Sequence, residues 1–183
     1  MSHSALAYRA HEDDDRKVSS QFEQITVESP AAGEVLVKVA YSSVNYKDAL
    51  ATTGAGRIIR GYPRIAGIDL AGTVVESGDD RYSAGDEVVL TGYSHGESLD
   101  GGYTELAKVG AEYLVPLPAG LSLQEAMSIG TAGFTAALSV HRLQQIGVTA
   151  ESGTILVTGA TGGVGSIAID ILSKLGYQVA AFT

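Results

Sequence analysis

The chain has 183 residues, 45% of them hydrophobic and 18% charged, which is a composition typical of globular proteins. Its formal net charge of −9 argues against a nucleic-acid partner, because an acidic surface repels phosphate backbones. The absence of cysteine excludes disulfides, thiolate zinc ligands and cysteine nucleophiles. Because the sequence has neither a long apolar run nor a basic start followed by an apolar segment, we expect a cytoplasmic protein without membrane contact.

Residues 1–121 are expected to form a β domain. Short apolar or β-branched runs alternate there with turn signals such as "SPAAGE" and "SGDDRYSAGDE". In "EVLVKVA", Val35, Val37 and Val39 form a fully apolar face and the residues between them form a mixed one. This pattern is typical of a strand packed against a core on one side. The other expected strands are "ALAYRA", "QFEQITVE", "IDLAGTVVES", "GDEVVLTG", "YTELAKV" and "YLVPL".

The hydrophobic period changes at residue 122. Ser122 and Glu125 have the spacing of a capping box, and "GFTAALSVHRLQQIG" carries a helical apolar pattern that ends at Gly147. A β-branched run at 154–158, an amphipathic helix in "GGVGSIAIDILSKLG" and a strand in "YQVAAFT" follow. This order predicts the first part of a doubly wound, Rossmann-type domain over residues 122–183. The expected fold class is therefore mixed β and α/β.

The glycine-rich stretch "VTGATGGVGS" (157–166) allows three interpretations. One is the dinucleotide fingerprint, as Ala160-x-Gly162-x-x-Gly165, with the strand before it and the helix after it that this motif requires. The glycines would let the backbone approach a pyrophosphate, and amides at the helix start would donate to it. The second is a tight turn without a ligand. The third, T-G-x-x-x-G-x-G, is typical of short-chain dehydrogenases; we reject it because a long β-rich region precedes it and no Tyr-x-x-x-Lys pair is present.

Two further motifs have a structural alternative. "GYSHG" (92–96) matches G-x-S-x-G, but a nucleophile elbow needs a helix immediately after it, so we expect a loop tip and no catalytic Ser94. No two histidines have metal-ligand spacing, and His141 is interpreted as a structural residue on or beside the apolar face of a helix. The stretch "SSVNYKDALATTG" (42–54) places polar residues after a buried strand, which fits both a site at the mouth of a β domain and a plain helix start.

Several segments together resemble the medium-chain dehydrogenases. They are "SSVNYKDALATTG", "PRIAGIDLAGTV", "IGTAGFTAAL" and "VTGATGGVGS", in this order and at that family's spacing. The zinc-free quinone-oxidoreductase branch fits best, and "NYKDAL" and "GRIIRGYPRIAGIDLAG" are similar to its acrylyl-CoA reductase members. The resemblance implies a GroES-like substrate domain at 1–121, the start of a Rossmann NADP-binding domain at 122–183, and a homodimeric parent enzyme. It also implies NADPH as cofactor and an enoyl-CoA or a quinone as small-molecule substrate.

The resemblance further implies that no zinc is bound. Zinc-dependent relatives have a Cys at the position of Asn45, a His within the triplet that is Gly67-Ile68-Asp69 here, and another Cys at the position of Thr131. The stretch 92–103 also lacks the cysteines of the structural zinc lobe. Polarisation of a substrate carbonyl would then depend on hydrogen-bond donors.

The same resemblance assigns the site residues. Asn45, Tyr46 and Asp48 are the expected catalytic group, with Tyr46 also contacting the cofactor and Asp48 orienting the loop. The expected cofactor contacts are Tyr46, Thr131, Thr135, Thr161, Gly162, Gly163, Val164, Gly165 and Thr183. Another set, Arg57, Arg60 and Arg64, would either meet an acyl-CoA phosphate or belong to the plain surface.

Family members are about twice as long, and a 2′-phosphate-recognising stretch of the Ser-Gly-Arg type begins where Thr183 stands. We therefore expect a truncated chain that is inactive by itself. The expected activity of the parent is NADPH-dependent hydride transfer to an acrylyl-CoA-like enoyl thioester. Two alternatives stay open, an NADPH:quinone oxidoreductase and a non-catalytic GroES-like binding module.

Overall fold

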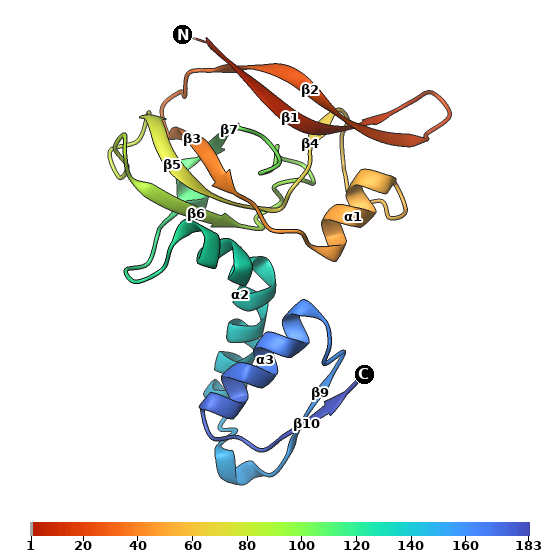
Figure 1. Ribbon diagram of the computed structural model, residues 1–183, viewed down its shortest axis with the longest axis vertical. Helices are drawn as coiled ribbons and strands as arrows, with labels where there is room; N and C mark the ends of the chain where they lie inside the picture. The colour runs from red at the N-terminus through yellow and green to blue at the C-terminus, as the bar shows by residue number, and fades with distance from the viewer. Residues whose placement is uncertain (1) are drawn as a thin grey trace. The chain divides into compact units, whose positions relative to one another are not determined.

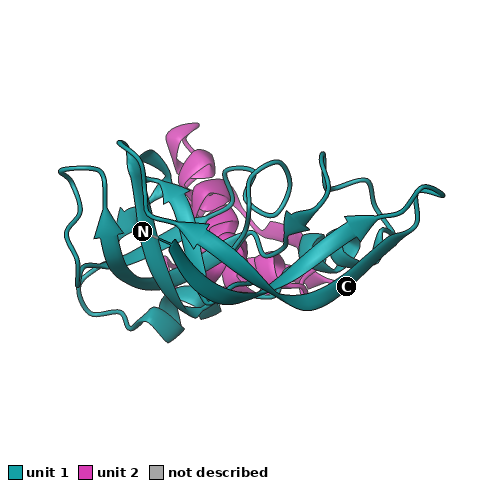
Figure 2. Cartoon of the chain, turned by 90° about the horizontal axis from the view of Figure 1, so that it is seen from above, with its two compact units in different colours: residues 1–128 teal, residues 129–183 magenta. Residues whose placement is uncertain are grey.

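The computed structural model describes residues 2–183 as two compact units. The first unit ends at Ser128 and the second is Ile129–Thr183; Figure 2 colours them separately. The division falls inside helix α2 (Leu123–Gln145), whereas the boundary expected after residue 121 precedes this helix. The predicted capping box is present, because the Glu125 amide donates to Ser122 Oγ at 3.2 Å and the Ser122 amide donates to the Glu125 carboxylate at 2.9 Å. In residues 2–183, no helix is both long and apolar enough to cross a membrane.

The first unit contains two antiparallel sheets. The strand order is β2-β1-β4 in the smaller sheet and β7-β3-β5-β6-β8 in the larger one. The long β1–β2 hairpin lies alongside the larger sheet (Figure 1), and a bridge between Ala7 and Thr104 joins them. The strands are β1 (Ser2–Glu12), β2 (Val18–Glu28), β3 (Glu34–Tyr41), β4 (Arg64–Ile65), β5 (Asp69–Ser77), β6 (Glu87–Thr91), β7 (Leu106–Gly110) and β8 (Val115–Pro116), with a 3-10 turn at Ala111–Tyr113.

Strand β3 is buried on both faces in its first half. Val35 and Val37 belong to the main core of the larger sheet, as their alternation predicts. Leu36 is equally buried, because it packs against Ala5 and Val27 of the β1–β2 hairpin. The expectation that β3 packs against a core on one side only is therefore corrected, because both of its faces are covered in this half of the strand. The sequence pattern of β3 does not show that a second, distant pair of strands covers its other side.

The second unit begins within α2, where Gly130 (φ 49°, ψ −157°) interrupts the helix. It continues with a 3-10 turn (Ala150–Ser152), β9 (Ile155–Thr158), α3 (Gly163–Lys174) and β10 (Val179–Phe182). The strands β9 and β10 form a parallel pair, and α3 connects them (Figure 1). A parallel pair joined by a crossover helix is the βαβ unit of doubly wound folds. The predicted mixed β and α/β class is confirmed.

Candidate active site

The segment that follows β3 is fastened to a buried carboxylate. Ser42 Oγ donates to the carbonyl of Asp69 at 2.6 Å, and Asn45 Nδ2 donates to its Oδ2 at 3.0 Å. The hydroxyl of Ser43 donates to the same carboxylate oxygen. Asp69 is completely buried at the start of β5. Since a buried carboxylate is stable only when donors surround it, Ser43 and Asn45 are held in place by the requirement to satisfy the Asp69 side chain, and Ser42 is held by its bond to the Asp69 backbone.

Asp48 holds the start of helix α1 (Tyr46–Thr53). The residue is 2% exposed, and its two carboxylate oxygens accept the backbone amides of Asn45 at 2.8 Å and Ile68 at 3.0 Å. Burial raises the pKa of Asp48, and the nearby charge of Asp69 raises it further, against the lowering effect of these hydrogen bonds. Both oxygens are used by the backbone, so the geometry fits the orienting role that the resemblance implies.

The neighbours of Asp48 in the N-Y-K-D motif face outward. Tyr46 is 81% exposed at the first position of α1. Lys47 forms an ion pair with Glu97 at 2.7 Å, which ties α1 to the loop between β6 and β7. The fold therefore fixes Asn45 on the protein side and presents the Tyr46 ring on the surface, where a ligand can reach it.

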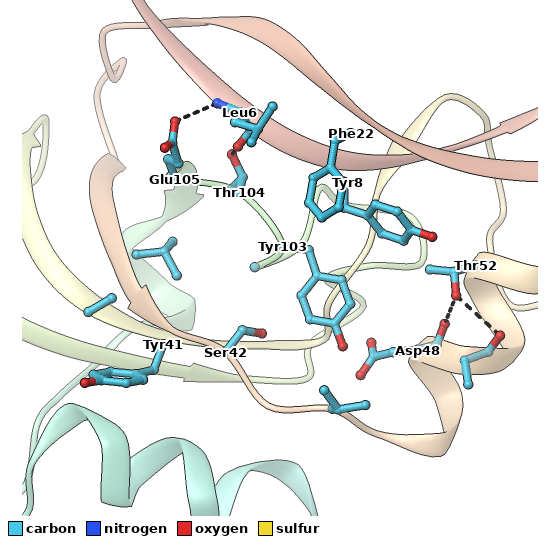
Figure 3. A pocket seen from close by; sticks show the side chains of 15 residues that line it. Leu6, Tyr8, Phe22, Tyr41, Ser42, Asp48, Thr52, Tyr103, Thr104 and Glu105 are labelled. Atoms are coloured by element: carbon cyan, nitrogen blue, oxygen red, sulfur yellow. Dashed lines mark hydrogen bonds between the residues drawn. The ribbon is translucent and has the colours of Figure 1, made fainter.

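Tyr103 also belongs to this cluster and was not among the site residues expected from the sequence. Its hydroxyl donates to the carbonyl of Ser43 at 3.1 Å and lies beside the Asp48 carboxylate (Figure 3). Burial and the charges of Asp48 and Asp69 raise the pKa of Tyr103 far above its usual value. The signal that could have found it is the pair of glycines before it. A Cβ at Gly101 or Gly102 would overlap the backbone of residues 66–69, so this stretch must pack directly on the site.

A cavity of about 730 Å³ opens next to the cluster, within the first unit. Its walls are mostly apolar, and the rings of Tyr8, Phe22 and Tyr103 surround it, with Asp48 at one end (Figure 3). The Tyr8 and Phe22 rings contact each other with centroids 4.9 Å apart. Its size and its few polar groups are those of a small-molecule pocket.

In the second unit, the glycine loop forms an open helix N-terminus. The first helical bond of α3 runs from the Ser166 amide to the Gly162 carbonyl at 2.9 Å, so the amides of Gly163, Val164 and Gly165 have no partner within the helix. A Cβ at Gly165 would overlap the Gly159 carbonyl, which shows how closely α3 packs on the loop. Free amides at a helix start bind anions, so these residues fit the pyrophosphate of a dinucleotide.

Other expected cofactor contacts gather around this loop. Thr161 Oγ1 lies 3.0 Å from Thr183 Oγ1, at the ends of β9 and β10. Thr131 follows the break in α2 at Gly130. The next residue, Ala132, lies close to Gly163, because a Cβ added at Gly163 would be 3.3 Å from the Ala132 Cβ. Thr135 is exposed one turn further along α2. Within the second unit, the structure thus brings the loop, Thr161, Thr183 and the segment of Thr131 together.

The remaining candidates have other environments. Ser94 lies in a loop without a following helix, as expected, and its carbonyl accepts the backbone amides of residues 97–99. His141 is exposed, as are Phe134 and Leu138 on the same face of α2, and its Nε2 lies 3.0 Å from the side-chain Nε2 of Gln145. Arg64 pairs with Asp100 at 3.1 Å.

The positions that correspond to zinc ligands hold other side chains. Asn45 is engaged with Ser43 and Asp69, and Ile68 is a buried aliphatic residue that cannot coordinate a metal. In the described part of the chain, residues 2–183, no three His, Asp or Glu side chains form a group that could hold a metal ion. The donor set at this position is therefore suited to hydrogen bonding.

Comparison with known proteins identifies the family. Residues 31–119 match the alcohol dehydrogenase GroES-like domain. The chain is 58% identical over 166 residues to YhfP of Bacillus subtilis, which is named as a quinone oxidoreductase, and 52% identical over 167 residues to the acrylyl-CoA reductase AcuI of Ruegeria pomeroyi. Each alignment covers 91% of this chain, which spans about half the length of these curated relatives (50% and 51%).

Solved structures agree with this result. The yhdH oxidoreductase of Salmonella enterica in complex with NADP is 52% identical with a TM-score of 0.91, covering 96% of this chain and 54% of that one. The NAD-bound yhfP protein of Bacillus subtilis is 54% identical with a TM-score of 0.92, covering 98% and 54%. The chain belongs to the medium-chain dehydrogenase/reductase family, in the group of the quinone-oxidoreductase and acrylyl-CoA reductase relatives.

Proposed function

We propose that this chain supplies the substrate domain and the pyrophosphate-binding loop of a zinc-free, NADPH-dependent reductase of short α,β-unsaturated acyl-CoA thioesters. The observation that carries the proposal is the fastening of Asn45 to the buried Asp69, where zinc-dependent relatives place metal ligands. The similarity to an acrylyl-CoA reductase and to an NADP-bound structure supports the substrate class and the cofactor.

The residues of the site suit the reduction of an activated C=C bond. NADPH, when bound, supplies the hydride that the β-carbon of the thioester accepts. Negative charge then develops on the thioester carbonyl oxygen and must be stabilised by donors that are already in position until the α-carbon takes up a proton. Asn45 and Asp48 hold the first turn of α1, and the exposed Tyr46 hydroxyl is the donor that this turn offers to the carbonyl oxygen.

The expected contacts with the pyrophosphate and the adenosine ribose come from the second unit. The amides of Gly163, Val164 and Gly165 hold the pyrophosphate, and Thr161 and Thr183 lie together at the strand ends where the adenosine ribose binds in doubly wound domains. Similar solved structures contain either cofactor, because one is bound to NADP and another to NAD. The preference of this protein for NADPH over NADH is therefore part of the proposal.

A second candidate is quinone reduction. The name of the Bacillus subtilis relative and the cavity with aromatic walls in the first unit favour it. A third, of another class, is a GroES-like module without catalysis. It predicts that a protein with this sequence, at the full length of its relatives, folds but does not bind NADPH in calorimetry.

The test measures NADPH oxidation by that full-length protein with acrylyl-CoA and with a simple benzoquinone. We expect kcat/KM to be at least tenfold higher with acrylyl-CoA. The reverse order would replace the proposal by quinone reduction, and turnover with neither substrate would reject both. Tyr46→Phe should lower kcat without unfolding the protein, and unchanged turnover and NADPH affinity would remove Tyr46 from the site.

A further inference from the structure

Tyr103 lies where three segments of the first unit meet. Its backbone amide donates to the Ala66 carbonyl at 2.9 Å, and its carbonyl accepts the Tyr8 amide at 2.8 Å. Its ring packs on Gly67, whose φ is 93° and where an added Cβ would lie 2.5 Å from Tyr103 Cδ1. The side chain therefore has a single direction, toward the 42–48 segment, where its hydroxyl reaches the Ser43 carbonyl at 3.1 Å.

We propose that Tyr103 is a positioning residue of the active site, whose hydroxyl holds the Ser43 carbonyl and thereby sets the placement of Asn45 and Tyr46. This inference rests on the proposed reductase function, because it concerns the same site. The hydrogen bond joins residues 60 positions apart in the sequence, and it acts on the connection between β3 and α1, from which the proposed catalytic side chains project.

The Tyr103 hydroxyl is a donor in these surroundings. A tyrosine is already protonated at neutral pH, and burial together with the charges of Asp48 and Asp69 raises the pKa of Tyr103 further. A group that does not lose its proton is unsuited to general base catalysis and well suited to holding a carbonyl. Tyr103 also lines the apolar cavity, which the polar side chains of Ser42 and Asp48 reach as well (Figure 3).

The chain contains a matched control for this bond. Tyr82 is buried in the main core, and its hydroxyl donates to the Leu114 carbonyl at 2.6 Å. Tyr82→Phe removes the same kind of tyrosine-to-carbonyl bond as Tyr103→Phe, but in the core of the larger sheet. A purely structural role for Tyr103 predicts that both variants behave alike.

The first experiment follows amide hydrogen exchange of the 183-residue chain. In Tyr103→Phe we expect the amides of Asn45, Asp48 and Ala49 to exchange at least fivefold faster, while in Tyr82→Phe their rates stay unchanged. Equal protection of these amides in Tyr103→Phe and in the wild type would overturn the inference. This readout does not depend on catalysis, so it decides the inference even if the proposed function fails.

The second experiment compares the two variants in the full-length protein. Tyr103→Phe should lower kcat with acrylyl-CoA about tenfold, while the NADPH Kd, determined mainly by the glycine loop, changes less than about threefold. Tyr82→Phe should lower Tm and leave kcat and KM unchanged. A Tyr103→Phe enzyme with wild-type kcat, or an equal loss of kcat in Tyr82→Phe, would contradict a positioning role.

Discussion

The Ile68 amide donates to Oδ1 of Asp48 at 3.0 Å and joins the start of α1 to the segment that leads into β5. The other carboxylate oxygen accepts the Asn45 amide at 2.8 Å. One buried side chain thus connects two parts of the backbone that both carry site residues. A carboxylate suits this position because it has two acceptor oxygens and no donor.

Asp48→Asn should therefore destabilise the first unit, although it removes a buried charge. A carboxamide accepts with one oxygen only, and its NH2 group would face the second backbone amide. We expect the free energy of unfolding to fall by about 1–3 kcal/mol, the usual cost of an unsatisfied buried group. Urea denaturation followed by tyrosine fluorescence measures this change.

The matched control for Asp48→Asn is Asp100→Asn. Asp100 also accepts a backbone amide, that of Ile65 at 3.1 Å, but its side chain is half exposed. Water can replace the lost acceptor there, so we expect a change below about 1 kcal/mol. Equal losses of unfolding free energy in the two variants would contradict the role of Asp48 in connecting the two backbone segments.

Gly165→Ala should weaken dinucleotide binding more than Gly162→Ala does. A Cβ at Gly165 overlaps the Gly159 carbonyl and must push α3 away from the loop, whereas a Cβ at Gly162 would lie 3.3 Å from the same oxygen at a φ of −77° that alanine adopts readily. In the full-length protein we expect the NADPH Kd to rise at least tenfold for Gly165→Ala and less than about threefold for Gly162→Ala. Calorimetry measures the NADPH Kd of both variants. Equal Kd values would show that the position of α3 relative to the glycine loop does not determine dinucleotide affinity.

The glycine loop and the N-Y-K-D segment were predictable from sequence because their geometry is local. The helical spacing after Gly163 depends on residues only a few positions apart, and the orienting role of Asp48 was expected from the family resemblance of its segment. Tyr103 and the buried state of Asp69 were not predictable, because they depend on the packing of residues 66–69 against 101–103. The same reason explains Leu36, whose burial comes from a hairpin that precedes it in the chain.

His95 should make the first unit less stable at acidic pH. Burial lowers the pKa of His95 below its ordinary value of 6.5, and its Nδ1 lies 3.1 Å from the Gly92 carbonyl. As the pH falls, His95 becomes protonated at a higher pH in the unfolded chain than in the folded one. The stability contributed by neutral His95 is therefore fully present above the unfolded pKa of 6.5 and is lost as the pH falls from 6.5 toward the lowered folded pKa. We expect the free energy of unfolding to decrease between about pH 7.5 and 5.5.

The His95→Gln variant isolates this contribution. Asp48 acts in the opposite direction, because its raised pKa makes its protonation favour the folded state as the pH falls. The difference between wild type and His95→Gln, measured by urea denaturation at each pH, cancels that effect. A difference that is constant from about pH 7.5 to 5.5 would contradict the role of His95.

The 183-residue chain should bind hydrophobic dyes and should not turn over NADPH. Its second unit has only two parallel strands, and Leu156 on β9 and Phe182 on β10 are largely exposed. Parallel sheets are normally covered on both faces, so this pair lacks a closed core. We expect amides of β9 and β10 to exchange at least tenfold faster than those of β3 and β5, and dye fluorescence to exceed that of the full-length protein. Steady NADPH oxidation by the 183-residue chain with acrylyl-CoA would contradict this prediction.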